Sequence, residues 1–161
     1  MKNKLSATTG IKSKTRDITN HKAKAETRTK TIIRNVVTEV LEKNPKIRFA
    51  YFFGSFVAEK KYLDIDIGIY LAALPTGNPF TFTSDLKHKI SRKLLKNKIY
   101  LGADNIDIVI LNLIPFTFLY RIFKEGSLIL DRDPDLRAGV IEENSLKFRE
   151  CLGLLKEAQI L

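Results

Sequence analysis

Two aspartates that share one face of a predicted strand carry the clearest chemical signal in the sequence. Asp64 and Asp66 lie two residues apart within YLDIDIGIYL, and alternate side chains of a strand leave the same face. Carboxylates held this close repel each other, so either one pKa is raised or a cation binds between them. Oxygen ligands favour magnesium or manganese. The alternative is that both aspartates are ordinary exposed residues on the polar face of a strand.

A third carboxylate, Asp107, lies in the apolar stretch NIDIVILNL, which we expect to form another strand. Its neighbours on both faces are apolar, so an unpaired charge there would be costly and we expect a cation nearby. If the two strands pair, Asp107 can complete a three-carboxylate cluster with Asp64 and Asp66. Such a cluster could hold two metal ions that neutralise a triphosphate and activate an attacking oxygen.

A glycine and a serine, Gly54-Ser55, end the apolar stretch that precedes these aspartates. Glycine permits close approach to the backbone, and the backbone N–H and the serine hydroxyl can both hold phosphate oxygens. A Gly-Ser pair also commonly marks a simple turn. The residues FVAEKKYL connect Ser55 to the aspartates, and Lys60 or Lys61 in this loop could supply positive charge.

The elements that must position these residues alternate between helical and extended patterns. Their order, α-β-β-α-β-α-β-α, predicts an α/β (α+β) domain with a small mixed sheet of about four strands flanked by helices. The prediction treats residues 73–83 as a loop, starts the second helix with Ser84 as its cap, and packs the last helix on the sheet. The expected helices begin near Thr29, Ser84, Pro115 and Asp133-Pro134, and the expected strands are IRFAYFFGS, YLDIDIGIYL, NIDIVILNL and SLILDR.

Positive charge is concentrated at the N-terminus. The 161 residues carry a net charge of +10. Residues 1–30 contain much of the excess, and their Lys-, Thr- and Ser-rich composition offers little apolar surface for burial. We therefore expect residues 1–27 to be a disordered basic tail and residues 28–161 to be the folded domain. Such a tail could make weak electrostatic contact with nucleic acid.

Several classes of protein are disfavoured. The lone cysteine, Cys151, cannot form an internal disulfide, which points to a reducing compartment such as the cytoplasm. No apolar run approaches the roughly 20 residues of a membrane span. His21 lies in the tail and His88 on a lysine-rich predicted helix, so neither suits a Ser-His-Asp or Cys-His site.

Together, Gly54-Ser55, the Asp64-Ile65-Asp66 motif and a later strand carrying Asp107 resemble the DNA polymerase beta superfamily of nucleotidyltransferases. The small size is similar to its minimal nucleotidyltransferase (MNT) branch, whose members are antitoxins beside HEPN-domain toxins. The resemblance implies a polymerase-beta-like fold in which Asp64, Asp66 and Asp107 hold two Mg²⁺ ions. It also implies that Gly54 and Ser55 contact the triphosphate of ATP.

The function implied by this resemblance is transfer of AMP from ATP to a hydroxyl group of a HEPN toxin, which silences the toxin. The loop after Ser55 is shorter than is common in the family, so a catalytically degenerate antitoxin that acts by binding alone stays an alternative. A further alternative is transfer to a small molecule such as an aminoglycoside. That reaction would need more protein surface around the acceptor molecule, and the second subunit of a homo-oligomer could supply this surface.

Overall fold

The computed structural model describes the backbone of residues 9–159 and the side chains of residues 25–159. In this part of the chain, helices and strands follow the expected order, with one additional short α-helix after the first strand and two short 3-10 helices, Ala103–Asn105 and Leu111–Leu113. The helices are α1 (Thr9–Glu42), α2 (Ser55–Ala58), α3 (Pro79–Lys96), α4 (Phe116–Glu125) and α5 (Pro134–Glu157). The strands are β1 (Ile47–Phe53), β2 (Ile65–Leu71), β3 (Ile106–Ile110) and β4 (Ser127–Asp131).

The four strands form one mixed sheet in the order β3-β2-β1-β4. β1 lies at the centre and pairs antiparallel with both β2 and β4. β2 and β3 are parallel, so the chain must cross over between them, and α3 makes this crossover. The predicted α+β domain with a mixed four-stranded sheet is confirmed.

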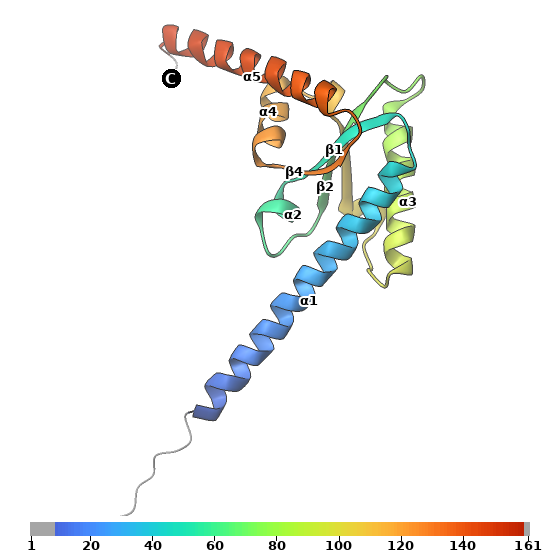
Figure 1. Ribbon diagram of the computed structural model, residues 1–161, viewed down its shortest axis with the longest axis vertical. Helices are drawn as coiled ribbons and strands as arrows, with labels where there is room; N and C mark the ends of the chain where they lie inside the picture. Colours follow the sequence, from blue (N-terminus) through green and yellow to red (C-terminus); the bar gives the residue numbers. More distant parts are fainter. Residues whose placement is uncertain (1–8, 160–161) are drawn as a thin grey trace, which may run out of the picture.

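Helices cover both faces of this sheet (Figure 1). On one face, α1 and α3 bury apolar stripes that include Ile33, Val37 and Ile90 against alternate strand residues. On the other face, Leu119 and Ile122 of α4 pack in a second cluster. Each fully buried Leu or Ile side chain stabilises the fold by about 1.5–3 kcal/mol, so the two clusters fix the sheet between the helices.

The helix boundaries differ from the sequence predictions at two places. α1 begins at Thr9, well before the expected start near Thr29, and its N-terminal part projects away from the sheet (Figure 1). A helix that is nucleated by the packed residues can extend outward without further burial. The division of the chain into a tail at 1–27 and a domain at 28–161 stays a prediction, and residues 1–8 lie outside the described residues.

The second difference concerns α3, which begins at Pro79 and not near Ser84. The Asn78 side chain accepts a hydrogen bond from the Phe80 N–H at 2.9 Å, and Pro79 occupies the first helical position, where no N–H is needed. The expected loop at 73–83 therefore ends at Asn78. In the sequence, the pair Asn78-Pro79, a capping residue followed by proline, indicates that the helix begins here.

The last helix was expected on the sheet, but α5 packs mainly along α4 (Figure 1). Leu136 and Val140 in its first turns contact the cluster on the α4 side of the sheet. Farther along, Tyr120 of α4 stacks on Phe148 with ring centroids 4.0 Å apart. The structure confirms a helix that begins at Pro134, but its main packing partner is α4 and not the sheet.

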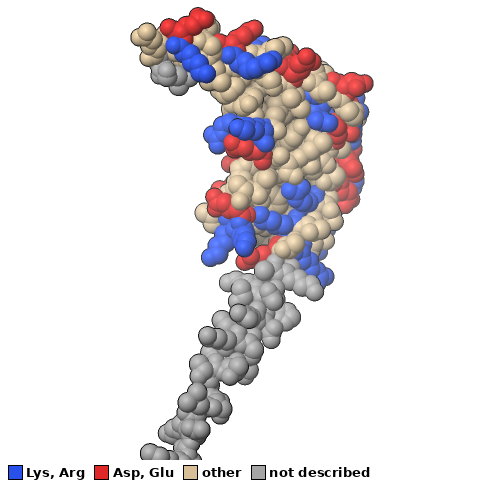
Figure 2. All heavy atoms as spheres, turned by 60° about the vertical axis from the view of Figure 1, so that its left-hand side comes forward, with Lys and Arg blue, Asp and Glu red and all other residues tan. Residues whose placement is uncertain are grey.

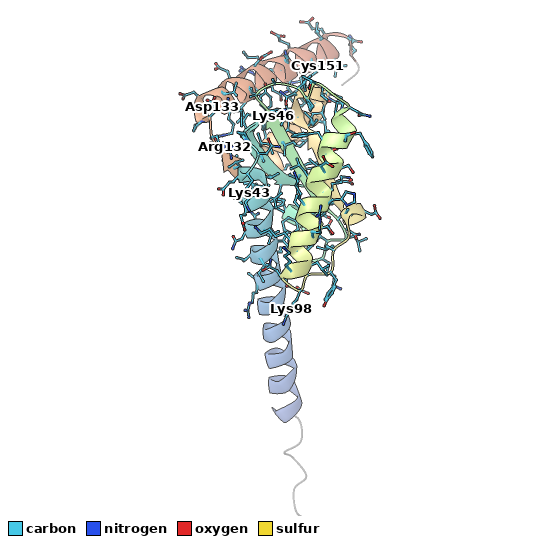
Figure 3. All side chains as sticks on the ribbon, turned by 90° about the vertical axis from the view of Figure 1, so that its right-hand side faces the viewer. Lys43, Lys46, Lys98, Arg132, Asp133 and Cys151 are labelled. Carbon is cyan, nitrogen blue, oxygen red and sulfur yellow. The ribbon has the colours of Figure 1, made fainter. Side chains whose placement is uncertain are left out.

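Arg132 ties the turn before α5 to the end of α1. Its guanidinium donates hydrogen bonds to the carbonyl oxygens of Glu42 and Asn44, which lie where α1 ends. Figure 3 shows Arg132 near Lys43 and Lys46 at this junction. A cation at the C-terminal end of a helix satisfies carbonyl groups that have no partner within the helix.

The surface of the domain carries both signs of charge. On the face drawn in Figure 2, basic and acidic side chains are interspersed, with no broad area of one sign. Among the described residues, no helix is both long enough and apolar enough to cross a membrane.

Candidate active site

The site begins where β1 ends, at Gly54. This residue has φ 66° and ψ −155°, a backbone conformation that is essentially restricted to glycine. A Cβ atom placed on Gly54 would lie 2.2 Å from Oδ2 of Asp66. The sequence therefore needs glycine here for two reasons, because the backbone angle strains any other residue and an added side chain would displace the adjacent carboxylate.

The predicted carboxylates come together through strand pairing. In the parallel register of β2 and β3, Asp66 is the Cα partner of Asp107, and Asp64 lies one residue before β2. The pKa of Asp66 is raised, first by burial and then by the negative charges of Asp107 and Asp64. The strand register therefore places the three carboxylates in one region at the same end of the sheet.

The environment of Asp107 differs from the sequence expectation. Its side chain is 62% exposed, not enclosed by apolar neighbours, and Lys87 of α3 donates to Oδ1 at 3.0 Å. β3 lies at the edge of the sheet, and its buried residues, Ile106, Ile108 and Ile110, all point to the other face. Lys87 supplies positive charge beside Asp107, and burial of Asp107 was the wrong part of the prediction, while a metal ion at this position stays a prediction.

The donor set fits a hard divalent cation, although the side chains are not gathered into a finished site. Among the described residues, no group of three or more His, Cys, Asp or Glu side chains is arranged to hold a metal ion. The available donors are carboxylate oxygens, the ligands that Mg²⁺ and Mn²⁺ prefer. Asp64 and Asp107 are exposed, and a metal ion would have to replace the contacts they now make, because Asp64 accepts a hydrogen bond from Asn105 at 3.4 Å and Asp107 is paired with Lys87. Burial and the charges of Asp107 and Asp64 raise the pKa of Asp66, and a bound cation would relieve the repulsion between these charges.

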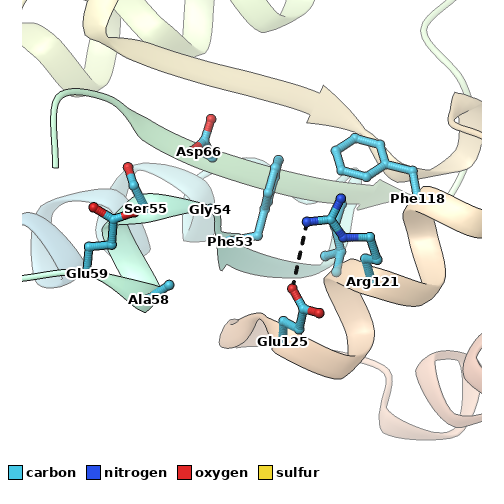
Figure 4. A pocket seen from close by; sticks show the side chains of 10 residues that line it. Phe53, Gly54, Ser55, Ala58, Glu59, Asp66, Phe118, Arg121 and Glu125 are labelled. Carbon is cyan, nitrogen blue, oxygen red and sulfur yellow. Dashed lines mark ion pairs between the residues drawn. The ribbon is translucent and has the colours of Figure 1, made fainter.

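A pocket of about 330 Å³ lies beside Gly54, Ser55 and Asp66, and α4 forms its opposite wall. Figure 4 shows the side chains of Phe118, Arg121 and Glu125 from α4 facing the end of β1 across this pocket. The Phe118 ring packs edge-on against Phe53, with centroids 5.7 Å apart. Arg121 contacts Glu125 only loosely, at 4.0 Å, and both side chains are exposed.

Arg121 is a cation of this pocket that the sequence reasoning did not identify. Phe118, Arg121 and Glu125 share one helical face by their spacing, but that spacing alone does not indicate what the face meets. The long-range packing of α4 beside β1 brings Arg121 to Gly54 and Ser55. A guanidinium offers several donors suited to phosphate oxygens.

The two lysines of the loop have other surroundings. Lys60 lines a second pocket, of about 430 Å³, between α1 and the loop, together with Lys30 and Arg34. Lys61 is exposed and lines neither pocket. Lys60 and Lys61 are therefore not in the pocket that contains Asp66, and their predicted role in triphosphate binding stays a prediction.

Comparison with known proteins places this geometry in a family. The family model described as Polymerase beta, Nucleotidyltransferase matches residues 35–135. This range contains Gly54, Ser55 and all three aspartates. No curated protein sequence matches the chain.

Solved structures of toxin–antitoxin complexes share the fold. One is a complex of a tri-AMPylated Shewanella oneidensis HEPN toxin with an MNT antitoxin, which matches with a TM-score of 0.59 and 16% identity over 80% of this chain and 94% of that chain. Another, the toxin–antitoxin MntA-HepT, gives a TM-score of 0.58 at 16% identity, again over 80% and 94%. A toxin–antitoxin with AMP-PNP gives 0.56 at 16% identity, over 78% and 94%.

These structural matches agree with the resemblance to MNT antitoxins, and at this level of identity they establish the fold. The family model spans more than half of the chain and includes the motif that suggested the superfamily. This protein therefore belongs to the polymerase beta nucleotidyltransferase family.

Proposed function

We propose that this protein is a metal-dependent nucleotidyltransferase that moves AMP from ATP to a hydroxyl group of a HEPN toxin and so acts as its antitoxin. The observation that carries the proposal is the position of Asp66. It lies directly against Gly54 and pairs in register with Asp107, and its pKa is raised by burial and by the charges of Asp107 and Asp64. A carboxylate site beside an open backbone turn suits a triphosphate with its divalent cation.

The triphosphate would lie in the pocket between Gly54 and α4. Because Gly54 has no side chain, phosphate oxygens can approach the backbone, and the Ser55 hydroxyl can donate to them. Arg121 faces the same space from α4 and can pair with a second phosphate group. The exposed Arg121–Glu125 contact is weak enough to be exchanged for a phosphate contact.

Asp64, Asp66 and Asp107 would hold Mg²⁺ or Mn²⁺. Bound metal would neutralise the phosphate charge and lower the pKa of the acceptor hydroxyl. The acceptor oxygen forms a bond to the α-phosphorus of ATP while the bond from that phosphorus to pyrophosphate breaks. Asp107 is exposed at the edge of the sheet, so it is well placed to accept the proton of the hydroxyl.

The nature of the partner is inferred from the structural neighbours. One complex combines an MNT antitoxin with a tri-AMPylated HEPN toxin, and another is the toxin–antitoxin MntA-HepT. We extend this partnership to the present chain because its fold covers most of the length of those chains. A homo-oligomer and weak contact of the N-terminal segment with nucleic acid are compatible with this role.

Two observations favour a second candidate, an antitoxin that acts by binding alone. Lys60 lies outside the pocket of Asp66, and Lys87 is already paired with Asp107. Both features would weaken catalysis, and both would leave unchanged the surface with which the protein could bind a toxin. The two candidates differ in whether neutralisation of the toxin needs ATP and the carboxylates.

The test is AMP transfer to a HEPN toxin encoded beside the gene. The protein is incubated with the toxin, ATP and Mg²⁺, and intact-protein mass spectrometry detects AMP added to the toxin. The double variant Asp64→Asn/Asp66→Asn should abolish the mass shift, whereas Asp85→Asn/Asp135→Asn removes the same charge from exposed helix positions and should preserve it. Full neutralisation by the first variant, with no mass shift for the native protein, would select the binding-only antitoxin.

A further inference from the structure

The loop between Ser55 and Asp64 is held by a residue from a distant part of the sequence. α2 is a single turn, and few carbonyl groups near its end have partners within the loop itself. Lys30 of α1 donates from Nζ to the Phe56 carbonyl oxygen at 2.7 Å and to the Glu59 carbonyl oxygen at 2.6 Å. Its ammonium group therefore satisfies two backbone acceptors in the loop, with the strength of charge-assisted hydrogen bonds.

Two aromatic rings complete the surroundings of the same ammonium group. Nζ of Lys30 lies 5.2 Å from the Phe56 ring centroid and 5.1 Å from that of Tyr62. The two rings pack edge-on with their centroids 4.8 Å apart. Phe56 is 1% exposed and anchors this arrangement in the core. Cation–π attraction and the hydrogen bonds thus act at one point.

The Lys30 ammonium group joins the two halves of the candidate site, which are the Gly54-Ser55 turn and the segment that leads to Asp64. Phe56 directly follows Ser55, and Tyr62 lies two residues before Asp64. We infer that Lys30 is a positioning residue for nucleotidyl transfer, which sets the separation between the Gly54-Ser55 turn and the Asp64 carboxylate. The inference rests on the proposed function for its catalytic consequence, while the contacts that define it are independent of that function.

The remainder of α1 stays attached to the sheet without Lys30. Ile33, Val37 and Leu41 are fully buried in the core. One turn beyond Lys30, Arg34 donates to the Ser127 hydroxyl at 3.0 Å and lies 5.2 Å from the Phe52 ring centroid. Loss of the Lys30 ammonium should therefore loosen the loop and leave the fold intact.

The experiment compares Lys30→Met, Lys30→Arg and the matched control Lys43→Met. Methionine keeps an unbranched chain but has neither charge nor donors, whereas arginine can donate to two carbonyl groups and lie against aromatic rings. Lys43 directly follows the last residue of α1, is 71% exposed, and forms an ion pair with Glu39 at 3.2 Å. Hydrogen–deuterium exchange of residues 54–64, kcat and KM for ATP are measured for each variant.

In Lys30→Met we expect exchange in residues 54–64 to speed up by about tenfold or more, because two charge-assisted hydrogen bonds are lost. KM for ATP should rise and kcat should fall, while exchange in β1 and β2 stays unchanged. Lys30→Arg should restore most of both properties, and Lys43→Met should match the native protein.

Unchanged exchange at 54–64 in Lys30→Met would overturn the inference, and so would faster exchange with native kcat and KM. If the native protein transfers no AMP to any acceptor, the proposed function fails. The positioning role for catalysis then fails with it, and the exchange data alone show whether Lys30 orders the loop.

Discussion

Replacement of Gly54 by alanine is the most direct perturbation of the site's backbone. At φ 66° and ψ −155° an L-residue is strained, and the added Cβ would meet Asp66 Oδ2 at 2.2 Å. The contact is with the end of a side chain, so the Asp66 carboxylate can swing away. That movement would relieve the clash but would displace the carboxylate from its position beside Asp64 and Asp107.

The expected loss of stability in Gly54→Ala follows from the backbone strain and from the clash with Asp66. A residue held in a conformation of this type costs about 1–3 kcal/mol. We therefore expect Gly54→Ala to lower the free energy of unfolding by about 1–3 kcal/mol, since rotation of Asp66 removes most of the additional clash. Nucleotide binding should be lost in the fraction that stays folded, because Asp66 and the backbone approach are both altered.

The assay is urea unfolding followed by circular dichroism, with ATP binding measured on the folded variant. Gly139→Ala is the matched control, because a Cβ there has no atom within 4 Å and lies inside α5. It should raise the free energy of unfolding by about 0.5–1 kcal/mol. Native stability and native ATP affinity in Gly54→Ala would refute the geometry described for this turn.

Three other perturbations have defined outcomes. Without divalent cations, Asp66→Asn should raise Tm at neutral pH, because the raised pKa of Asp66 means that its ionisation lowers the stability of the native protein. This gain in Tm should shrink as the pH falls through the pKa of Asp66, because the native carboxyl group is then protonated. A gain in Tm that stays constant across the pH series would contradict the prediction. Lys87→Met should tighten Mg²⁺ binding, because Asp107 loses a cation that competes with the metal ion. The measurement is the Mg²⁺ concentration that half-saturates the Tm shift. Weaker Mg²⁺ binding in this variant would count against Asp107 as a ligand. Deletion of residues 1–25 should change Tm by less than about 3 °C in scanning calorimetry, because the buried residues of α1 begin later; a larger fall would show that this segment packs on the domain.

The strands of the sheet were accessible from sequence because strand alternation is strongly constrained. Ile65, Ile67 and Ile69 are fully buried, as their alternation with polar and small residues predicted. The same periodicity put Asp64 and Asp66 on the opposite face. Once β2 and β3 pair in parallel, the register brings Asp107 beside Asp66, whereas from the sequence this pairing was only a condition for the cluster.

Other features depend on tertiary packing that local patterns do not contain. The exposure of Asp107 follows from the position of β3 at the sheet edge, and an apolar sequence around a residue cannot show which face is open. Arg121 joins the site only because α4 packs beside β1. The Lys30 contacts span 26 and 29 residues of sequence, so no periodicity could have revealed them.

Calorimetric titration of ATP, with Mg²⁺ and with EDTA, tests most directly whether the carboxylates beside Gly54 form a metal-dependent nucleotide site. The account predicts binding with Mg²⁺ and none in EDTA, because a triphosphate cannot approach Asp64, Asp66 and Asp107 without a screening cation. Asp64→Asn/Asp66→Asn should lose the Mg²⁺-dependent binding, while the Asp85→Asn/Asp135→Asn control should retain it. Equal affinity in Mg²⁺ and EDTA, or no binding in either condition, would contradict the central claim.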